Sequence, residues 1–188
     1  AITTALARFG LKIDEGVQAD GSEVGAYGPY KQSERKSIYL VFVKHLLELG
    51  FAYPCFCTSE ELEATRATQE EQKIRPGYYG EWAVHRDITL EEIKNNLAAG
   101  KSFVIRLKSN GSELNKIPFT DLIKGDVSVT ENDQDVVLLK SDQLPTYHFA
   151  HVVDDYLMKT THVLRGDEWL SSLPIHLQIF DLLGFKAP

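Results

Sequence analysis

The sequence predicts an α/β fold, because strand-like and helix-like runs alternate along its last third. Residues 136–139 are all Val or Leu, which is typical of a short buried strand. From Thr146, a residue type that caps helices, apolar positions recur at helical spacing. Residues 161–164 then predict a second strand, and the helix that follows it carries Pro174 near its start and ends at Gly184.

The first third of the chain predicts two helices. Apolar residues recur at helical spacing within the first nine positions. Residues 33–49 carry a longer apolar stripe, and Gly50 supplies the stop signal. The polar residues at the start of this helix fit a solvated helix end, and we expect Glu34 and Arg35 to orient neighbouring loops rather than to touch reacting atoms.

The middle of the chain predicts two strands and two capped helices. Residues 51–56 fit a short strand. Residues 103–108 place Phe103, Ile105 and Leu107 on one face and the basic Arg106 and Lys108 on the other, and so predict a half-exposed strand. Two capping boxes, each a Thr followed three residues later by a Glu, predict helix starts at Thr58 with Glu61 and at Thr89 with Glu92.

The composition is that of an ordinary globular chain. Its 188 residues are 43% hydrophobic and 25% charged, which is enough to bury one large core. The formal charge of -7 repels nucleic acid on average, so any RNA contact has to use a local basic patch. No run approaches the ~20 apolar residues that span a membrane, and no basic-then-apolar leader opens the chain, so we expect a cytoplasmic protein with no membrane partner.

Residues 138–172 are the stretch most suggestive of function, because charged, aromatic and apolar residues alternate there in an order that packing alone does not require. Tyr147 and His151 are four residues apart on a predicted helix and share one face. Arg165 follows the second predicted strand, and ligands bind at the carboxyl ends of strands in a doubly wound sheet. A planar Arg fork is suited to a carboxylate, since it offers two parallel hydrogen bonds.

Two motifs carry a family resemblance. The run "LPTYHFAHVVDDYLMKTTHVLRGDEWLSSLPIHLQIFDLLGF" and the earlier "GPYKQSER" resemble signatures of the catalytic domain of bacterial-type glutamyl-tRNA synthetases, which are class I aminoacyl-tRNA synthetases. The segments "CFCTSEELE", "FVIRLK" and "FTDLIKGDVSV" fall between them in the family order. The resemblance therefore covers essentially all 188 residues.

The resemblance implies a split domain. Residues 1–51 and 141–188 would be parts of a nucleotide-binding, Rossmann-like fold with a parallel strand pair between them. Residues 52–140 would be an inserted α+β domain that binds the tRNA acceptor end. The family places one ATP-binding signature upstream of Ala1 and the other downstream of Pro188, so we expect a fragment with no catalytic residue of its own and no activity alone.

The resemblance also implies the reaction. Glutamate is activated by ATP, with Mg²⁺, to glutamyl-adenylate, and the acyl group then passes to tRNA. The partners are thus L-glutamate, ATP and tRNA, and we expect a monomer. Tyr147, His151 and Arg165 match glutamate-binding positions, although the family usually has Asn where His151 stands. Gln143 likewise replaces a usual Gly.

Further positions follow from the same resemblance. Asp167, Glu168 and Trp169 match the motif that borders the adenylate site, and Trp169 is equally suited to packing. Candidate phosphate contacts for tRNA are basic side chains of the insertion, although a solvated sheet face is the more common place for such residues: Arg106, Lys108 and Lys124.

Cys55 and Cys57 form half of a tetrahedral zinc site. Members with zinc carry the other half, a Cys-x-His pair, where this chain has Trp82 and Val84. His85 is one residue off register and could supply at most a third ligand. We expect two reduced, partly buried thiols and no zinc.

Some features stay open or unassigned. "DEWLSS" favours a glutamate enzyme over its glutamine relatives and over the short paralogues that glutamylate a modified tRNA base, and a non-catalytic tRNA-binding module is the remaining alternative. Asp154 and Asp155 diverge on a helix, so a hydrogen-bonding role is expected instead of a metal pair. No role is assigned to four histidines in apolar patterns: His45, His148, His162 and His176.

Overall fold

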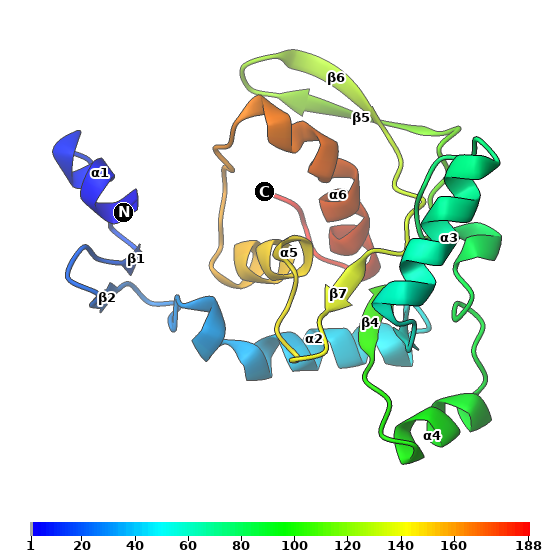
Figure 1. Ribbon diagram of the computed structural model, residues 1–188. Coiled ribbons are helices and arrows are strands. Elements are labelled where there is room, and N and C mark those ends of the chain that lie inside the picture. The colour runs from blue at the N-terminus through cyan, green and yellow to red at the C-terminus, as the bar shows by residue number, and fades with distance from the viewer. Residues whose placement is uncertain (1) are drawn as a thin grey trace.

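The computed structural model describes residues 2–188 as a mixed assembly of helices and strands (Figure 1). The α-helices are α1 (Ile2–Arg8), α2 (Lys36–Glu48), α3 (Ser59–Glu71), α4 (Leu90–Ala98), α5 (Tyr147–Leu157) and α6 (Leu173–Leu182). The strands are β1 (Gly16–Val17), β2 (Glu23–Val24), β3 (Ala52–Cys55), β4 (Val104–Leu107), β5 (Lys116–Asp121), β6 (Gly125–Thr130) and β7 (Val137–Leu139). Three short 3₁₀ helices complete these elements: η1 (Gln32–Glu34), η2 (Gly80–Trp82) and η3 (Asp167–Ser172).

The elements that depend on local signals form where the sequence predicts them. Both capping boxes are present, with the Thr side chain accepting from the third helical amide and the Glu side chain reaching back. Thr146 is the N-cap residue of α5, and Pro174 lies in the first turn of α6. Gly50 ends α2 with φ of +77°, in the left-handed region that glycine adopts without strain.

A three-stranded antiparallel sheet, in the order β3-β4-β7, forms the centre of the molecule. One face of this sheet packs against α2, α5 and α6, which lie together in Figure 1. The deepest members of this core, at 0% exposure, come from all three helices and from two strands: Tyr39, Leu46, Leu107, Leu138, Phe149, Val152, Val153 and Ile179.

The other face of the sheet is covered as well, which corrects the expectation of a half-exposed strand at 103–108. Tyr53, Cys55, Tyr78 and Ala83 form a second buried cluster there. Arg106 is only 8% exposed; its guanidinium lies 3.9 Å from the Tyr78 ring centroid and donates to the Asp135 carbonyl. Since β4 is the central strand with both faces covered, its alternating pattern does not mark a solvent side.

The expected parallel strand pair between the two ends of the chain does not form within residues 2–188. Every strand pair described there is antiparallel. Residues 161–164, predicted as a strand, are an exposed irregular segment, with Leu164 91% exposed. The β-branched composition favours extended backbone, but a strand also needs a hydrogen-bonded neighbour, and the described residues supply none for this segment.

A buried polar contact ties α2 to α5. Arg35, 1% exposed, donates through Nε to Asp154 at 2.8 Å and through NH1 to the Pro29 carbonyl at 2.7 Å. Tyr39 donates to the second Asp154 oxygen at 2.7 Å. Both expectations are confirmed here: Arg35 orients the preceding loop, and Asp154 serves as a hydrogen-bond acceptor between helices.

The predicted boundaries at 51/52 and 140/141 do not separate two cores. Strands β3, β4 and β7 lie within residues 52–140, yet their side chains share the main core with the helices of both ends. The division into domains therefore stays a prediction. Within residues 2–188 the longest helices have 13 residues, and none is long and apolar enough to cross a bilayer.

Candidate functional site

The predicted glutamate-binding side chains gather around the α5–α6 contact. Tyr147 and His151 lie on the same face of α5, with ring centroids 5.5 Å apart. Both face His176 of α6, whose ring centroid lies 5.6 Å from that of Tyr147 and 4.4 Å from that of His151. Trp169, on η3, closes the group at 4.9 Å from Tyr147.

Arg165 reaches the same group from the irregular segment before η3. Its NH1 lies 3.2 Å from Nδ1 of His176. None of the ion pairs formed within residues 2–188 includes Arg165. The structure thus brings Arg165, Tyr147 and His151 together, with the guanidinium unpaired by any carboxylate of the described chain.

Two open cavities border this group. One, of about 440 Å³, is lined by His151, Asp155, Arg165, Asp167 and His176 among others. The other, of about 620 Å³, includes Tyr147 and shares His151 and Asp155 with the first. Space for a small molecule therefore exists on both sides of His151.

Burial keeps the imidazoles of this site neutral. It lowers the pKa of His148 and of His151, and it lowers the pKa of His176 to about 3, with the neighbouring His151, His148 and Arg165 charges as smaller causes. Burial also raises the pKa of Asp155, whose Oδ2 lies 3.1 Å from His151 Nε2 without a directed hydrogen bond. Arg165 is then the group with a fixed positive charge.

Of the three predicted adenylate-site residues, Asp167 lines the first cavity. Asp167, Glu168 and Trp169 form the exposed start of η3. Trp169 is 42% exposed, so it packs against Tyr147 while part of its ring remains accessible. Asp167 is held by Lys124 at the turn between β5 and β6, with Nζ 2.7 Å from Oδ2.

The three predicted phosphate contacts differ in exposure: one side chain is buried and two are accessible. Arg106 is buried beneath Tyr78, so it is withdrawn as a phosphate ligand. Lys108 and Lys124 keep accessible side chains and each pairs with an exposed carboxylate, that of Asp87 in one case and Asp167 in the other. These two remain candidates.

Two further side chains lie beside the cysteine pair: His85, which the sequence predicts as a possible third ligand, and Tyr78, which it does not predict. Sγ of Cys55, Sγ of Cys57 and a ring nitrogen of His85 all lie within 4.8 Å of one another. The Tyr78 hydroxyl lies 3.3 Å from each sulfur. A hydrogen bond from Cys57 holds the pKa of Cys55 below its ordinary value.

These residues provide one ligand too few for a closed zinc site. Cys55, Cys57 and His85 offer three ligand atoms, whereas a structural zinc site takes four from Cys and His. Val84, at the position of the family's fourth ligand, is 67% exposed and apolar. The absence of zinc stays a prediction.

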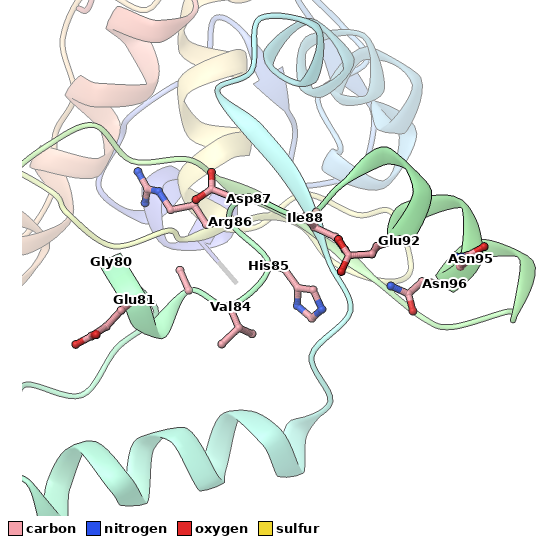
Figure 2. Close-up of a pocket in the computed structure, with 11 residues that line it drawn as sticks. Gly80, Glu81, Val84, His85, Arg86, Asp87, Ile88, Glu92, Asn95 and Asn96 are labelled. Carbon is pink, nitrogen blue, oxygen red and sulfur yellow. The ribbon is translucent and has the colours of Figure 1, made fainter.

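A third cavity, of about 600 Å³, lies away from the central group. It is formed by the loop after η2 and by α4, and Figure 2 draws His85 between Val84 and the α4 residues Glu92 and Asn96. His85 and Ala83, which also pack near the cysteine pair, line this cavity, and none of the predicted substrate residues does.

Sequence reasoning missed His148 and His176. His176 is 1% exposed, and its Nε2 lies 3.1 Å from Nδ1 of His148. Both residues fall on apolar helical faces, where a histidine is usually a packing residue, and their separation of 28 positions leaves no local signal. Only the crossing of α5 and α6 brings them together.

Comparison with known proteins gives a consistent result. The profile of the family "tRNA synthetases class I (E and Q), catalytic domain" matches residues 1–188. A glutamate–tRNA ligase of Clostridium perfringens strain 13 is 59% identical over 180 residues, which cover 96% of this chain and 33% of that protein. One from Acetivibrio thermocellus is 54% identical over 187 residues, covering 100% of this chain and 34% of that protein.

Two solved structures that resemble this chain are also glutamate–tRNA ligases. A glutamate tRNA ligase from Elizabethkingia meningosepticum, crystallised in complex with its amino acid, superposes with a TM-score of 0.86 at 38% identity and covers 100% of this chain and 37% of that one. One from Elizabethkingia anophelis gives a TM-score of 0.85 at 37% identity. The chain spans about a third of the length of the curated relatives it matches.

Proposed function

Because the chain belongs to the catalytic-domain family of class I tRNA synthetases for glutamate and glutamine, we propose that it forms the glutamate-binding part of an ATP-dependent glutamate–tRNA ligase. The observation that carries the proposal is Arg165, a guanidinium without a carboxylate partner among the described residues, at the edge of a cavity of about 440 Å³. A substrate with a side-chain carboxylate supplies that partner.

Charge favours glutamate over glutamine at this site. A planar guanidinium binds a carboxylate through two parallel, charge-assisted hydrogen bonds, whereas an amide offers one acceptor oxygen. The three neighbouring imidazoles are neutral at pH 7, because burial lowers the pKa of each, so they do not compete with Arg165 for the negative charge. Tyr147, 45% exposed, is free to donate its hydroxyl to the same carboxylate.

His151 takes the position at which the family usually has Asn. A neutral imidazole still offers one donor and one acceptor, so it can replace one polar contact of an amide. Its ring lies against His176, with 4.4 Å between centroids, which fixes its plane.

The proposed reaction uses positioning instead of a side-chain nucleophile. The α-carboxylate of glutamate attacks the α-phosphorus of ATP, taken with Mg²⁺, and pyrophosphate leaves. The terminal ribose of tRNA then takes the acyl group and AMP leaves. Asp167, Glu168 and Trp169 border the adenylate in this proposal, and Lys108 and Lys124 face the tRNA phosphates.

The test is substrate-dependent exchange by the full-length gene product. With tRNA present, ATP–pyrophosphate exchange should depend on L-glutamate and should be far weaker with L-glutamine. Labelled glutamate should become attached to the 3′ end of tRNA. Exchange that prefers glutamine, or label that ends on a modified base, would contradict the proposal.

A further inference from the structure

Arg165 lacks the support that its proposed role demands. The segment before it is irregular and exposed, so backbone hydrogen bonding to a neighbouring strand does not hold it. A binding group has to be held closely to be effective, and a long Arg side chain loses much rotamer freedom when it is fixed. The rigidity therefore has to come from a contact of the side chain itself.

Within residues 2–188, that contact is His176. The Arg165 side chain makes one hydrogen bond there, from NH1 to Nδ1 of His176 at 3.2 Å. His176 is 1% exposed and belongs to α6, next to core residues Ile179 and Phe180. It is thus a buried residue of the helical core that contacts a side chain from an irregular segment.

The hydrogen bonds determine the protonation of His176. Arg has only donors, so Nδ1 of His176 must accept and carries no proton. A neutral ring then has its proton on Nε2, which lies 3.1 Å from Nδ1 of His148 and donates to it. His148 in turn keeps its own proton on Nε2. One arrangement of protons satisfies both contacts.

The surroundings keep that arrangement neutral. His148, His151 and Asp155 face His176 from α5, and Arg165 faces it from the loop before η3. No carboxylate of residues 2–188 lies within ion-pair distance of its ring. Burial, with the charges of His151, His148 and Arg165 as smaller causes, lowers the pKa of His176 to about 3.

We propose that His176, oriented by His148, is a positioning residue that accepts a hydrogen bond from Arg165 and turns the rest of its guanidinium toward the substrate carboxylate. The inference rests on the proposed function. One N–H of the fork is used by His176, and the others remain for the ligand. His176 acts through Arg165 and is not itself a catalytic residue.

Two substitutions distinguish the role of Nδ1 of His176 from that of Nε2. His176→Asn places an amide oxygen near the position of Nδ1, and so keeps an acceptor for Arg165. His176→Gln reaches instead to the position of Nε2, so it keeps a partner for His148 and loses the acceptor. In the full-length gene product, the Gln variant should raise KM for glutamate ~10-fold, while the Asn variant stays within ~3-fold of wild type.

A matched control tests whether a general loss of stability is enough to change KM for glutamate. Ile179→Val, one turn along the same helix at a residue with 0% exposure, should lower Tm but leave KM for glutamate unchanged. KM for ATP should be unchanged in all three variants. Equal KM values for glutamate in the Asn and Gln variants would overturn the proposal.

A spectroscopic readout tests the same contact without activity. In ¹⁵N NMR spectra at pH 7, His176 should show a protonated Nε2 and a bare Nδ1, and Arg165→Ala should change the Nδ1 shift. A proton on Nδ1 would overturn the proposal. If the tautomer is as stated but the gene product does not use glutamate, the proposed function fails, while the positioning of Arg165 by His176 is supported.

Discussion

Arg35 and Asp154 form an ion pair across 119 residues of sequence, with 2.8 Å between Nε and Oδ1. Arg35 is 1% exposed, so water cannot solvate its charge if the carboxylate is removed. Asp154→Asn should lower the free energy of unfolding by about 3 kcal/mol, because one partner of a buried pair then remains alone. Urea unfolding measures this, with Asp181→Asn on the exposed face of α6 as the control. A loss below about 0.5 kcal/mol would show that the pair is not a stabilising contact.

Arg165→Ala in the full-length gene product should lower kcat/KM for glutamate by ~10² to 10³, because the substrate carboxylate loses its charged partner. KM for ATP and Tm should change little. Steady-state kinetics in each substrate, beside a melting curve, measures this. Arg66→Ala on α3, whose side chain is 70% exposed, is the matched control and should change neither. A parallel loss of ATP affinity and Tm would instead make Arg165 a structural residue.

Lys124→Ala should weaken tRNA binding and leave KM for glutamate unchanged. Its Nζ lies 2.7 Å from Asp167 at the edge of the proposed adenylate site, so the ammonium stands where phosphates would arrive. Loss of one phosphate contact should reduce the slope of log K against log salt by about 1. Filter binding at several salt concentrations measures the slope, and Lys44→Ala, on α2 at 75% side-chain exposure, should leave it unchanged.

Stability should fall as pH falls from 6.5 to 5, and His176 should account for much of that loss. Its pKa is about 3 when folded, below the ordinary 6.5, so the unfolded chain binds a proton that the folded chain does not. The pH-dependent loss from His176 alone is about 2 kcal/mol at pH 5. His176→Asn should flatten the curve by that amount. His148 and His151 act in the same direction, whereas the raised pKa of Asp155 acts in the opposite one.

The purified chain should hold less than one zinc per molecule after dialysis, because Cys55, Cys57 and His85 provide three ligand atoms. Elemental analysis measures this. Val84→His, which adds an imidazole at the family's position for the fourth ligand, should increase the zinc content. Stoichiometric zinc in the unmodified chain would contradict the prediction and would make Tyr78 or water the fourth ligand.

The sequence by itself determined the features that depend on a few neighbouring residues. Both capping boxes need only a Thr and a Glu three positions apart, so the starts of α3 and α4 were predictable. Tyr147 and His151 share a helix face because of helical periodicity alone. The family motifs, which are also local, predict Arg165 as the carboxylate partner.

Only the tertiary structure decided what each side chain meets. Arg106 is buried because Tyr78, from a distant loop, covers the second face of β4. Residues 161–164 are not a strand because a strand requires a partner that is not encoded in the segment itself. His176 meets His148 because α6 packs against α5 at that point. Burial, strand pairing and side-chain contacts depend on residues that are distant in the sequence, so a local sequence pattern cannot predict them.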